Sequence, residues 1–190
     1  MSTNSLVSVI IPVYNVEDYI EECLNSVINQ TYKNLEVLCV DDAGSDRSCE
    51  IVVEIQQQDD RVKIIKHEDN LGLARARNTG LYAAKGEYIY FLDSDDFLEE
   101  GVIEKMMDSA VSHMTDLVYS QVQLHIENGV NDDDLVDMKD YFDFHPVTGI
   151  INVDIYNFSK YLSEFPCVAW NKLIRRDFLK NKKIEFIPKN

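Results

Sequence analysis

Four consecutive residues, Asp93-Ser94-Asp95-Asp96, carry the side chains best suited to chemistry in this chain. They follow an apolar run from Tyr88 to Leu92, which predicts a buried strand. Three carboxylates at the end of such a strand repel one another and lose hydration, and a divalent cation relieves both penalties. Oxygen ligands suit Mg²⁺ or Mn²⁺, and these ions also bind phosphate oxygens. The segment therefore predicts a cation-bridged phosphate or diphosphate site.

The same acidic cluster has a simpler interpretation. Carboxylates are also favoured in solvated turns and at helix N-termini, and Glu99 and Glu100 begin a segment with helical periodicity. An isolated Asp-x-Asp would favour this alternative. The buried-strand context and the motifs upstream favour the ligand site.

Composition excludes several classes of partner. The chain has 190 residues, enough for one domain with a substantial core. Its net charge of −16 argues against nucleic-acid binding and against binding anionic lipid through this segment. No apolar run approaches the roughly 18 residues of a membrane span, and residues 6–12 lack the basic flank of a signal peptide.

The four cysteines form no Cys-x-x-Cys pair, so we expect buried free thiols and a reducing compartment. We therefore expect a cytoplasmic protein without a transmembrane segment. Any peripheral association with the inner face of the membrane would use parts outside this chain.

Short apolar runs alternate with helical periods through the first hundred residues. We expect strands at 6–11, 35–40, 62–65, 87–92 and 116–125, and helices at 16–29, 48–57, 73–84, 99–113 and 176–182. Ser45 or Asp46 is expected to cap the second helix, and Gly86 to end the third. This order predicts an α/β fold with a Rossmann-like, mostly parallel central sheet flanked by helices.

Ligands of such sheets bind at the carboxyl ends of the strands. Three polar loops, at 14–17, 41–46 and 93–96, lie there and can converge on one site. The organisation changes after about residue 127. Residues 128–140 are rich in Asp and predict a mobile surface loop, followed by a strand at 147–153 and a helix at 154–163.

Taken together, these motifs resemble glycosyltransferase family 2, whose members have the GT-A fold and use nucleotide sugars. The matching text is VSVIIPVYNVEDYIEECLNSVINQTYKNLEVLCVDDAGSD, then NLGLARARNTG, then GEYIYFLDSDD. The resemblance covers residues 6–125 closely and continues more loosely through VAWNKLIRRDFL. It implies a nucleotide-sugar-binding core with the Asp-x-Asp at 1–127. Residues 128–190 would be an acceptor-side segment of the same domain, truncated at its carboxyl end.

The resemblance also implies roles for residues in the first two polar loops. Pro12, Tyr14 and Asn15 would lie against the nucleotide base, with Glu17 nearby. The second residue of the pair Asp41-Asp42 would accept a hydrogen bond from the uracil imide, because a carboxylate is a pure acceptor. The alternative for both loops is local capping. The usual family text at the second loop is D-D-G-S-T-D, where this chain has D-D-A-G-S-D.

The remaining implied residues lie at the diphosphate. Asn70 and Arg77 match the family's N-x-G…A-R-N-x-G, and Arg77 would offer a permanent positive charge to the base carbonyl or the diphosphate. A surface ion pair is the alternative for Arg77. Asp95 would contact the metal directly, Asp93 would have a ribose or metal role, and Asp96 would support them.

The implied activity is a metal-dependent, inverting transfer of a hexose or N-acetylhexosamine in polysaccharide or glycoconjugate synthesis. The donor would be a nucleotide sugar, with UDP as the expected nucleotide, and the acceptor a carbohydrate or lipid-linked saccharide. Mn²⁺ or Mg²⁺ would be the cofactor. Such a reaction needs a general base, which in the family commonly sits in a Glu-Asp pair after a tract resembling residues 170–179. No such pair follows here, so we expect the base beyond Asn190, with Asp143, Asp154 and Glu164 as alternatives.

Two other functions compete with this one. Haloacid dehalogenase-type phosphatases also place Asp-x-Asp after an apolar strand, with the first Asp, here Asp93, as nucleophile. Their motif normally opens the chain and carries Thr or Val where this chain has Phe97. A nucleotide-binding unit that does not turn over is the second alternative.

Overall fold

The computed structural model describes residues 4–120 and 169–188. The strands within them are β1 (Val7–Val13), β2 (Leu35–Asp41), β3 (Val62–Lys66), β4 (Tyr88–Phe91), β5 (Leu117–Tyr119) and β6 (Lys172–Arg175). They form one sheet in the order β3-β2-β1-β4-β6-β5. The pairs among β1 to β4 are parallel, whereas β6 runs antiparallel to both β4 and β5. The structure thus confirms the mostly parallel α/β sheet.

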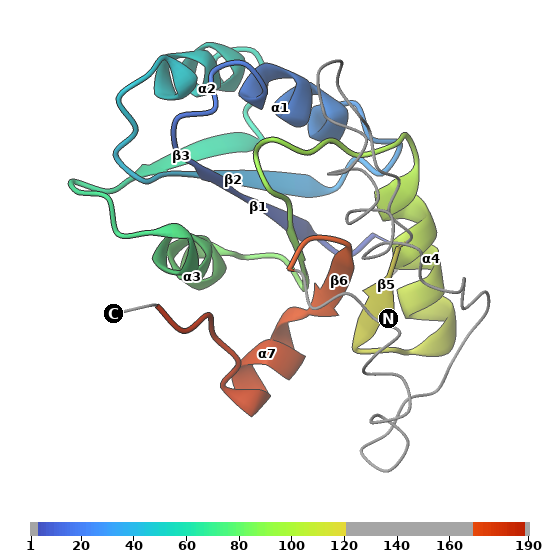
Figure 1. Cartoon of the computed structure of the whole chain (residues 1–190). Helices are drawn as coiled ribbons and strands as arrows, with labels where there is room; N and C mark the ends of the chain where they lie inside the picture. Colours follow the sequence, from blue (N-terminus) through green and yellow to red (C-terminus); the bar gives the residue numbers. More distant parts are fainter. Residues whose placement is uncertain (1–3, 121–168, 189–190) are drawn as a thin grey trace, which may run out of the picture. The chain divides into compact units, whose positions relative to one another are not determined.

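Helices cover both faces of this sheet (Figure 1). They are α1 (Ile20–Ile28), α2 (Ser48–Gln56), α3 (Leu73–Ala83), α4 (Val102–His113) and α7 (Arg176–Lys182). Alternate β1 side chains enter two cores. Val9 and Ile11 pack in the larger core with Leu24 of α1, whereas Ile10 packs with Leu81 of α3 in the smaller one. Because β1 is buried on both faces, its sequence is continuously apolar.

Two helices begin later than their periodicity predicts. Helix α1 begins at Ile20 instead of residue 16, and before it the backbone N–H groups of Val16 and Glu17 donate to the side chains of Ser48 and Asp46. Helix α4 begins at Val102 instead of residue 99. Gly101 before it has a left-handed φ of 79°, which interrupts the helical path.

Strand β6 was missed by the sequence analysis. It has only two apolar residues between charged ends, and its partners, Tyr88 to Tyr90, lie more than eighty positions away. Strand β5 is shorter than the expected 116–125 within the described residues, ending at Tyr119. The expected loop at 128–140, strand at 147–153 and helix at 154–163 lie outside the described residues, as does Cys167.

Gly86 does not end the third helix, although the sequence predicted that it would. Helix α3 ends at Ala83, and its cap residue is an extended Ala84. Gly86 is instead needed for close approach, since a Cβ there would lie 2.6 Å from the Ser8 backbone nitrogen. The expected buried thiols are confirmed for Cys23 and Cys39. No helix in the described parts of the chain has the length and apolarity to cross a bilayer.

A buried carboxylate closes the amino end of the sheet beside Gly86. One oxygen of Glu36 accepts hydrogen bonds from the Ser8 hydroxyl at 2.6 Å, the Lys85 N–H at 2.6 Å and the Gly86 N–H at 3.1 Å. The other oxygen pairs with Lys63 at 3.4 Å. Burial alone would raise the pKa of Glu36, but these donors hold it below its usual value. The group is structural and fully satisfied.

Candidate functional site

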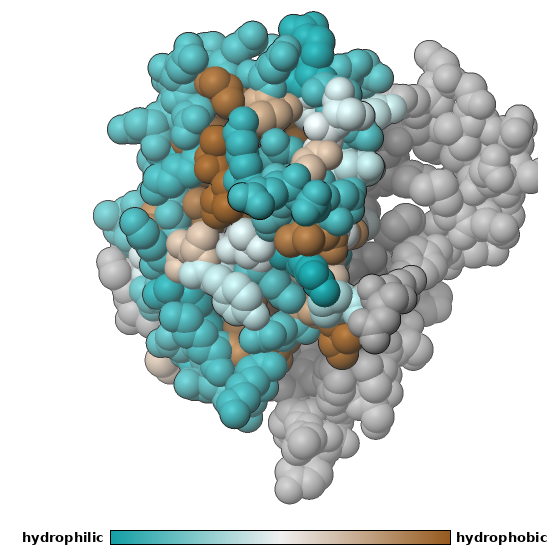
Figure 2. Space-filling model, turned by 90° about the vertical axis from the view of Figure 1, so that its left-hand side faces the viewer, coloured by the Kyte–Doolittle hydropathy of each residue, from teal (hydrophilic) through white to brown (hydrophobic). Residues whose placement is uncertain are grey.

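A cleft of about 430 Å³ lies at the opposite edge of the sheet, where the parallel strands end. It is lined by Pro12, Val13, Tyr14, Val16, Asp42, Asn70, Gly72, Leu73, Ala76, Asp93, Ser94 and Asp95. Figure 2 looks toward this edge and shows apolar side chains exposed among hydrophilic ones. The volume is within the usual range for small-ligand sites. Asp42 and Asp95, from two different strand ends, therefore share one cavity.

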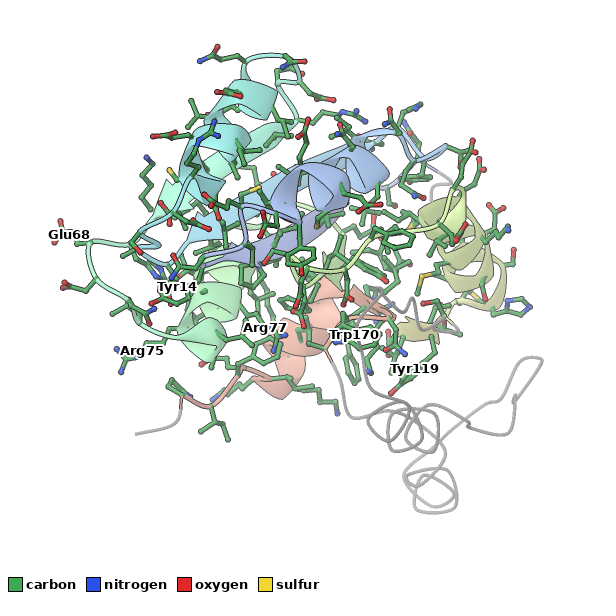
Figure 3. All side chains as sticks on the ribbon, turned by 45° about the horizontal axis from the view of Figure 1, so that its top comes forward. Tyr14, Glu68, Arg75, Arg77, Tyr119 and Trp170 are labelled. Atoms are coloured by element: carbon green, nitrogen blue, oxygen red, sulfur yellow. The ribbon has the colours of Figure 1, made fainter. Side chains whose placement is uncertain are left out.

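The structure divides the expected site residues into two groups. Pro12, Tyr14, Asp42, Asn70, Asp93 and Asp95 line the cleft, whereas Asn15, Glu17, Asp41, Arg77 and Asp96 do not. Tyr14 is 48% exposed and presents its ring at the cleft (Figure 3). Six of the eleven residues thus line the cavity, and the other five lie outside its lining.

Asn15 and Glu17 join the first two loops. The Asn15 side-chain oxygen accepts the Ser45 N–H at 2.8 Å, and the Glu17 carboxylate accepts the Arg47 N–H at 2.8 Å. The Asp46 carboxylate accepts from the Glu17 N–H at 2.9 Å and also from Ser48. Arg47 occupies the cap position of α2, but Asp46 supplies the capping acceptor. These contacts fix the loop that carries Tyr14.

Asp42 organises a third loop. Its carboxylate accepts hydrogen bonds from the backbone N–H groups of Leu71 at 2.9 Å and Gly72 at 2.8 Å. His67 Nδ1 lies 2.6 Å from the same carboxylate, and His67 Nε2 lies 2.9 Å from the Thr79 hydroxyl of α3. The buried Asp42 therefore holds the loop before α3 against the end of β2.

The turn after Asp42 contains backbone strain. Ala43 has a left-handed φ of 58°, a conformation that suits glycine better. The glycine of this chain stands one position later, where a Cβ would lie 3.2 Å from the Asn15 nitrogen. Asp41 is buried at the start of the turn and accepts the Gly44 N–H at 3.3 Å. The departure from the usual family text thus places Ala43 in an unfavourable backbone region.

Arg77 lies behind the Asp-x-Asp segment. Its guanidinium donates to Asp93 at 2.5 Å, and only 12% of its side chain is exposed. Arg75, two positions earlier on α3, points in a different direction from Arg77 (Figure 3). The separation of the two arginines follows the helical spacing. Arg77 therefore places its positive charge next to the cleft, where it is paired with the cleft-lining carboxylate of Asp93.

The rest of the Asp-x-Asp segment is electrostatically unfavourable. Burial, with the charges of Asp95 and Asp93, raises the pKa of Asp96 to about 6. Cys23 of α1 donates to the Asp93 carbonyl oxygen at 3.6 Å, and burial, with Cys39 and the same carboxylates, raises the pKa of its thiol. A cation placed near Asp95 would relieve the repulsion.

The carboxylates do not form a complete metal cage. Among the described residues, no three His, Cys, Asp or Glu side chains are placed to hold an ion together. Asp93 is paired with Arg77, whereas Asp95 is exposed at the cleft. Mg²⁺ is commonly bound by one or two carboxylates together with ligand phosphates. The donor set fits a cation shared with a bound phosphate better than a resident structural ion.

The sequence model of the family described as glycosyl transferase family 2 matches residues 8–181. The chain belongs to this family. Family 2 membership removes the basis for the phosphatase alternative, because the Asp-x-Asp now belongs to a glycosyltransferase pattern. The matched range includes all the residues that line the cleft.

Relatives and solved structures of the family extend the comparison. The putative glycosyltransferase EpsH of Bacillus subtilis is 36% identical over 183 residues, covering 95% of this chain and 50% of EpsH. The crystal structure of S. aureus TarS 1-349 in complex with UDP-GlcNAc superposes with a TM-score of 0.73 and 27% identity, covering 96% of this chain and 48% of that one. The chain therefore spans about half the length of EpsH and of the TarS 1-349 chain.

A second family structure contains a metal ion. The mannosyltransferase PcManGT from Pyrobaculum calidifontis, in complex with GDP-Man and Mn²⁺, has a TM-score of 0.52 and 29% identity. The matched region covers 60% of this chain and 33% of the PcManGT chain. The family fold thus accommodates Mn²⁺ with a nucleotide sugar in at least one member.

The sequence analysis assigned no site role to His67 and did not consider Phe186. The signal for His67 was available, because it follows β3 directly and so must lie near the ends of the neighbouring strands. Phe186 gave no such signal, since its contacts with α3 depend on pairing across 108 positions. Neither residue lines the cleft, but His67 contacts Asp42 and Phe186 contacts Arg77.

Proposed function

We propose that this chain forms the donor-binding part of a metal-dependent, inverting glycosyltransferase that uses a nucleotide sugar, with UDP as the nucleotide. One observation carries the proposal: side chains from the ends of β1, β2 and β4 and from the start of α3 line a single cleft. The reaction would move a hexose or N-acetylhexosamine to a carbohydrate or lipid-linked acceptor. Membership of family 2 and the likeness to TarS in complex with UDP-GlcNAc support this choice of donor.

The base end of the nucleotide would lie between Tyr14 and Asp42. Tyr14 offers an exposed aromatic face for stacking. Asp42 already accepts three contacts within the protein, but a carboxylate has about four acceptor sites. It can therefore accept an imide N–H in addition. The fixed geometry of Leu71 and Gly72 would shape this end of the cleft.

The diphosphate end would lie at the Asp-x-Asp segment. Asp95 would hold Mn²⁺ or Mg²⁺ together with the phosphate oxygens, and Asp93 and Asp96 would add negative charge beside the ion. When bound, the cation would stabilise the negative charge of the departing nucleoside diphosphate. Arg77 would add a permanent positive charge from behind Asp93. Protein charges fixed in place before the reaction stabilise developing charge effectively.

Thermal unfolding with a panel of nucleoside diphosphates tests this proposal. Ligand at about 100 times its Kd stabilises a protein by about 2.7 kcal/mol. We expect UDP with Mn²⁺ to give the largest stabilisation, UDP alone less, and Asp95→Asn to abolish the effect of the metal. Asp60→Asn, on an exposed residue outside the cleft, is the matched control. Equal stabilisation of Asp95→Asn and the wild type would refute the proposal.

A transfer assay then separates catalysis from binding. Binding of UDP and Mn²⁺ without sugar transfer would identify the 190 residues as a nucleotide-binding unit, with the general base outside them. Measurable transfer would place the base within the chain.

A further inference from the structure

Residues 184–188, here called the strap, follow α7 and run alongside α3. The side-chain amide of Asn78 on α3 pairs with both backbone groups of Phe186 in the strap. Its Nδ2 donates to the Phe186 carbonyl oxygen at 2.8 Å, and its Oδ1 accepts the Phe186 N–H at 2.9 Å. Asn78 is buried, so breaking this pair would leave polar groups unsatisfied. The strap is therefore held at one defined register.

The register of the strap places the Phe186 ring between a strand and an arginine. The ring packs edge-on against Phe91 of β4, with centroids 5.0 Å apart and an interplanar angle of 83°. The Arg77 guanidinium carbon lies 5.2 Å from the same ring's centroid. Arg77 directly precedes Asn78 on α3. The hydrogen bonds of the Asn78 amide and the contact of the Phe186 ring with Arg77 therefore reinforce each other.

Three successive contacts between neighbouring residues connect the strap to the cleft. Asn78 holds Phe186, the Phe186 ring covers Arg77, and Arg77 donates to Asp93, which lines the cleft. Arg77 Nε is buried and has no hydrogen-bond partner among the described residues. The ring and one carboxylate therefore hold a guanidinium that still has a donor to offer.

We propose that Phe186 and Asn78 are positioning residues that hold the Arg77 guanidinium, and through it Asp93, ready for the diphosphate of the nucleotide. This proposal rests on the proposed function. Arginine side chains have much rotational freedom, and a binding site that restricts it in advance loses less on ligand binding. A cation over an aromatic face is attracted to it, more strongly where water is excluded. Both effects favour the diphosphate end and leave the base end unchanged.

The test compares UDP with uridine by calorimetry, in the presence of Mn²⁺. Phe186→Leu keeps the apolar contact with Phe91 but removes the aromatic face. We expect it to weaken UDP binding roughly 3- to 10-fold and to leave uridine binding unchanged. Ile187→Ala, on the neighbouring strap residue that is 89% exposed, is the control and should change neither. In an Arg77→Gln background, Phe186→Leu should have no further effect on UDP.

A measurement without ligand tests the positioning directly. The Arg77 Nε–H signal in the nitrogen–proton spectrum, assigned by its loss in Arg77→Gln, should be sharp and slowly exchanging in the wild type. Phe186→Leu and Asn78→Ala should broaden it, and Ile187→Ala should not.

Equal weakening of UDP and uridine would show a general structural role and overturn the proposal, as would additive effects of the two substitutions. An unchanged Arg77 signal in Phe186→Leu would overturn it independently of any ligand. If the wild type bound no UDP, the proposed function would fail, and the spectrum would still decide whether the strap positions Arg77.

Discussion

Two carboxylates at opposite ends of the same sheet, the buried Glu36 and the half-buried Asp96, lie in opposite electrostatic environments. At the amino end, Glu36 accepts from Ser8, Lys85 and Gly86, pairs with Lys63, and has a lowered pKa. At the carboxyl end, burial and neighbouring carboxylates raise the pKa of Asp96 to about 6. One cluster is complete within the protein, whereas the other is left with repulsion that a ligand would relieve. The difference separates a structural carboxylate from a candidate functional one.

The largest effect is expected at the satisfied end. Glu36→Ala removes the acceptor of several buried donors, and we expect a loss of about 3 kcal/mol in the free energy of unfolding. Urea denaturation measures it. Glu54→Ala, on an exposed face of α2, should change stability by less than about 0.5 kcal/mol. A similar effect of the two substitutions would contradict the structural role of Glu36.

At the carboxyl end of the sheet, removing a carboxylate should raise the free energy of unfolding instead of lowering it. Asp96→Asn removes one of three repelling carboxylates, and we expect a gain of about 1 kcal/mol in unfolding free energy, allowing for solvent screening. The same substitution should reduce the stabilisation by UDP with Mn²⁺. Denaturation with and without the ligand pair measures both changes. A loss of stability in the absence of ligand would mean that Asp96 is already satisfied by the protein.

The pH dependence should identify Asp96 as the source of this gain. Its pKa is raised from 3.8 to about 6 in the folded protein, so the folded state holds the proton more tightly than the unfolded state. The wild type should therefore become more stable relative to Asp96→Asn as pH falls through about 6 toward 4. Paired unfolding curves between pH 4 and about 8 measure the difference. A difference that does not vary with pH would assign the gain to packing.

The smallest effect is expected in the strained turn beside the cleft. Ala43→Gly relieves a left-handed backbone angle but increases the freedom of the unfolded chain. We expect a net gain of about 0.5 kcal/mol, because the strain of a left-handed alanine is the larger of the two. A shift in the midpoint of thermal unfolding measures it, and a fall in the midpoint would show that the turn is not strained.

Local pattern and topology were sufficient to predict most of the core and part of the site. β1 and β4 are continuously buried, so their composition alone indicated strands. Because parallel strands end at one edge of the sheet, the sequence was enough to predict that Asp42 and Asp95 lie close together. Which loop residues line the cleft could not be predicted, because Asn15 and Glu17 satisfy loop N–H groups whose positions depend on the folded loops.

Contacts between residues that lie far apart in the sequence could not be predicted from local sequence patterns. β6 owes its strand conformation to pairing with β4, and the Asn78–Phe186 pair joins residues 108 positions apart. Neither leaves a periodic signal. The Asp42–His67 contact lies between these cases, since the ends of β2 and β3 were predicted to be close but the histidine's orientation was not.

We propose that the carboxylates at the carboxyl end of the sheet hold a cation together with a diphosphate. A Mn²⁺ titration followed by electron paramagnetic resonance, with and without UDP, tests it most directly. We expect weak Mn²⁺ binding by the protein alone, much tighter binding when UDP is present, and loss of that gain in Asp95→Asn. Mn²⁺ binding of equal strength with and without UDP, or unchanged in Asp95→Asn, would contradict it.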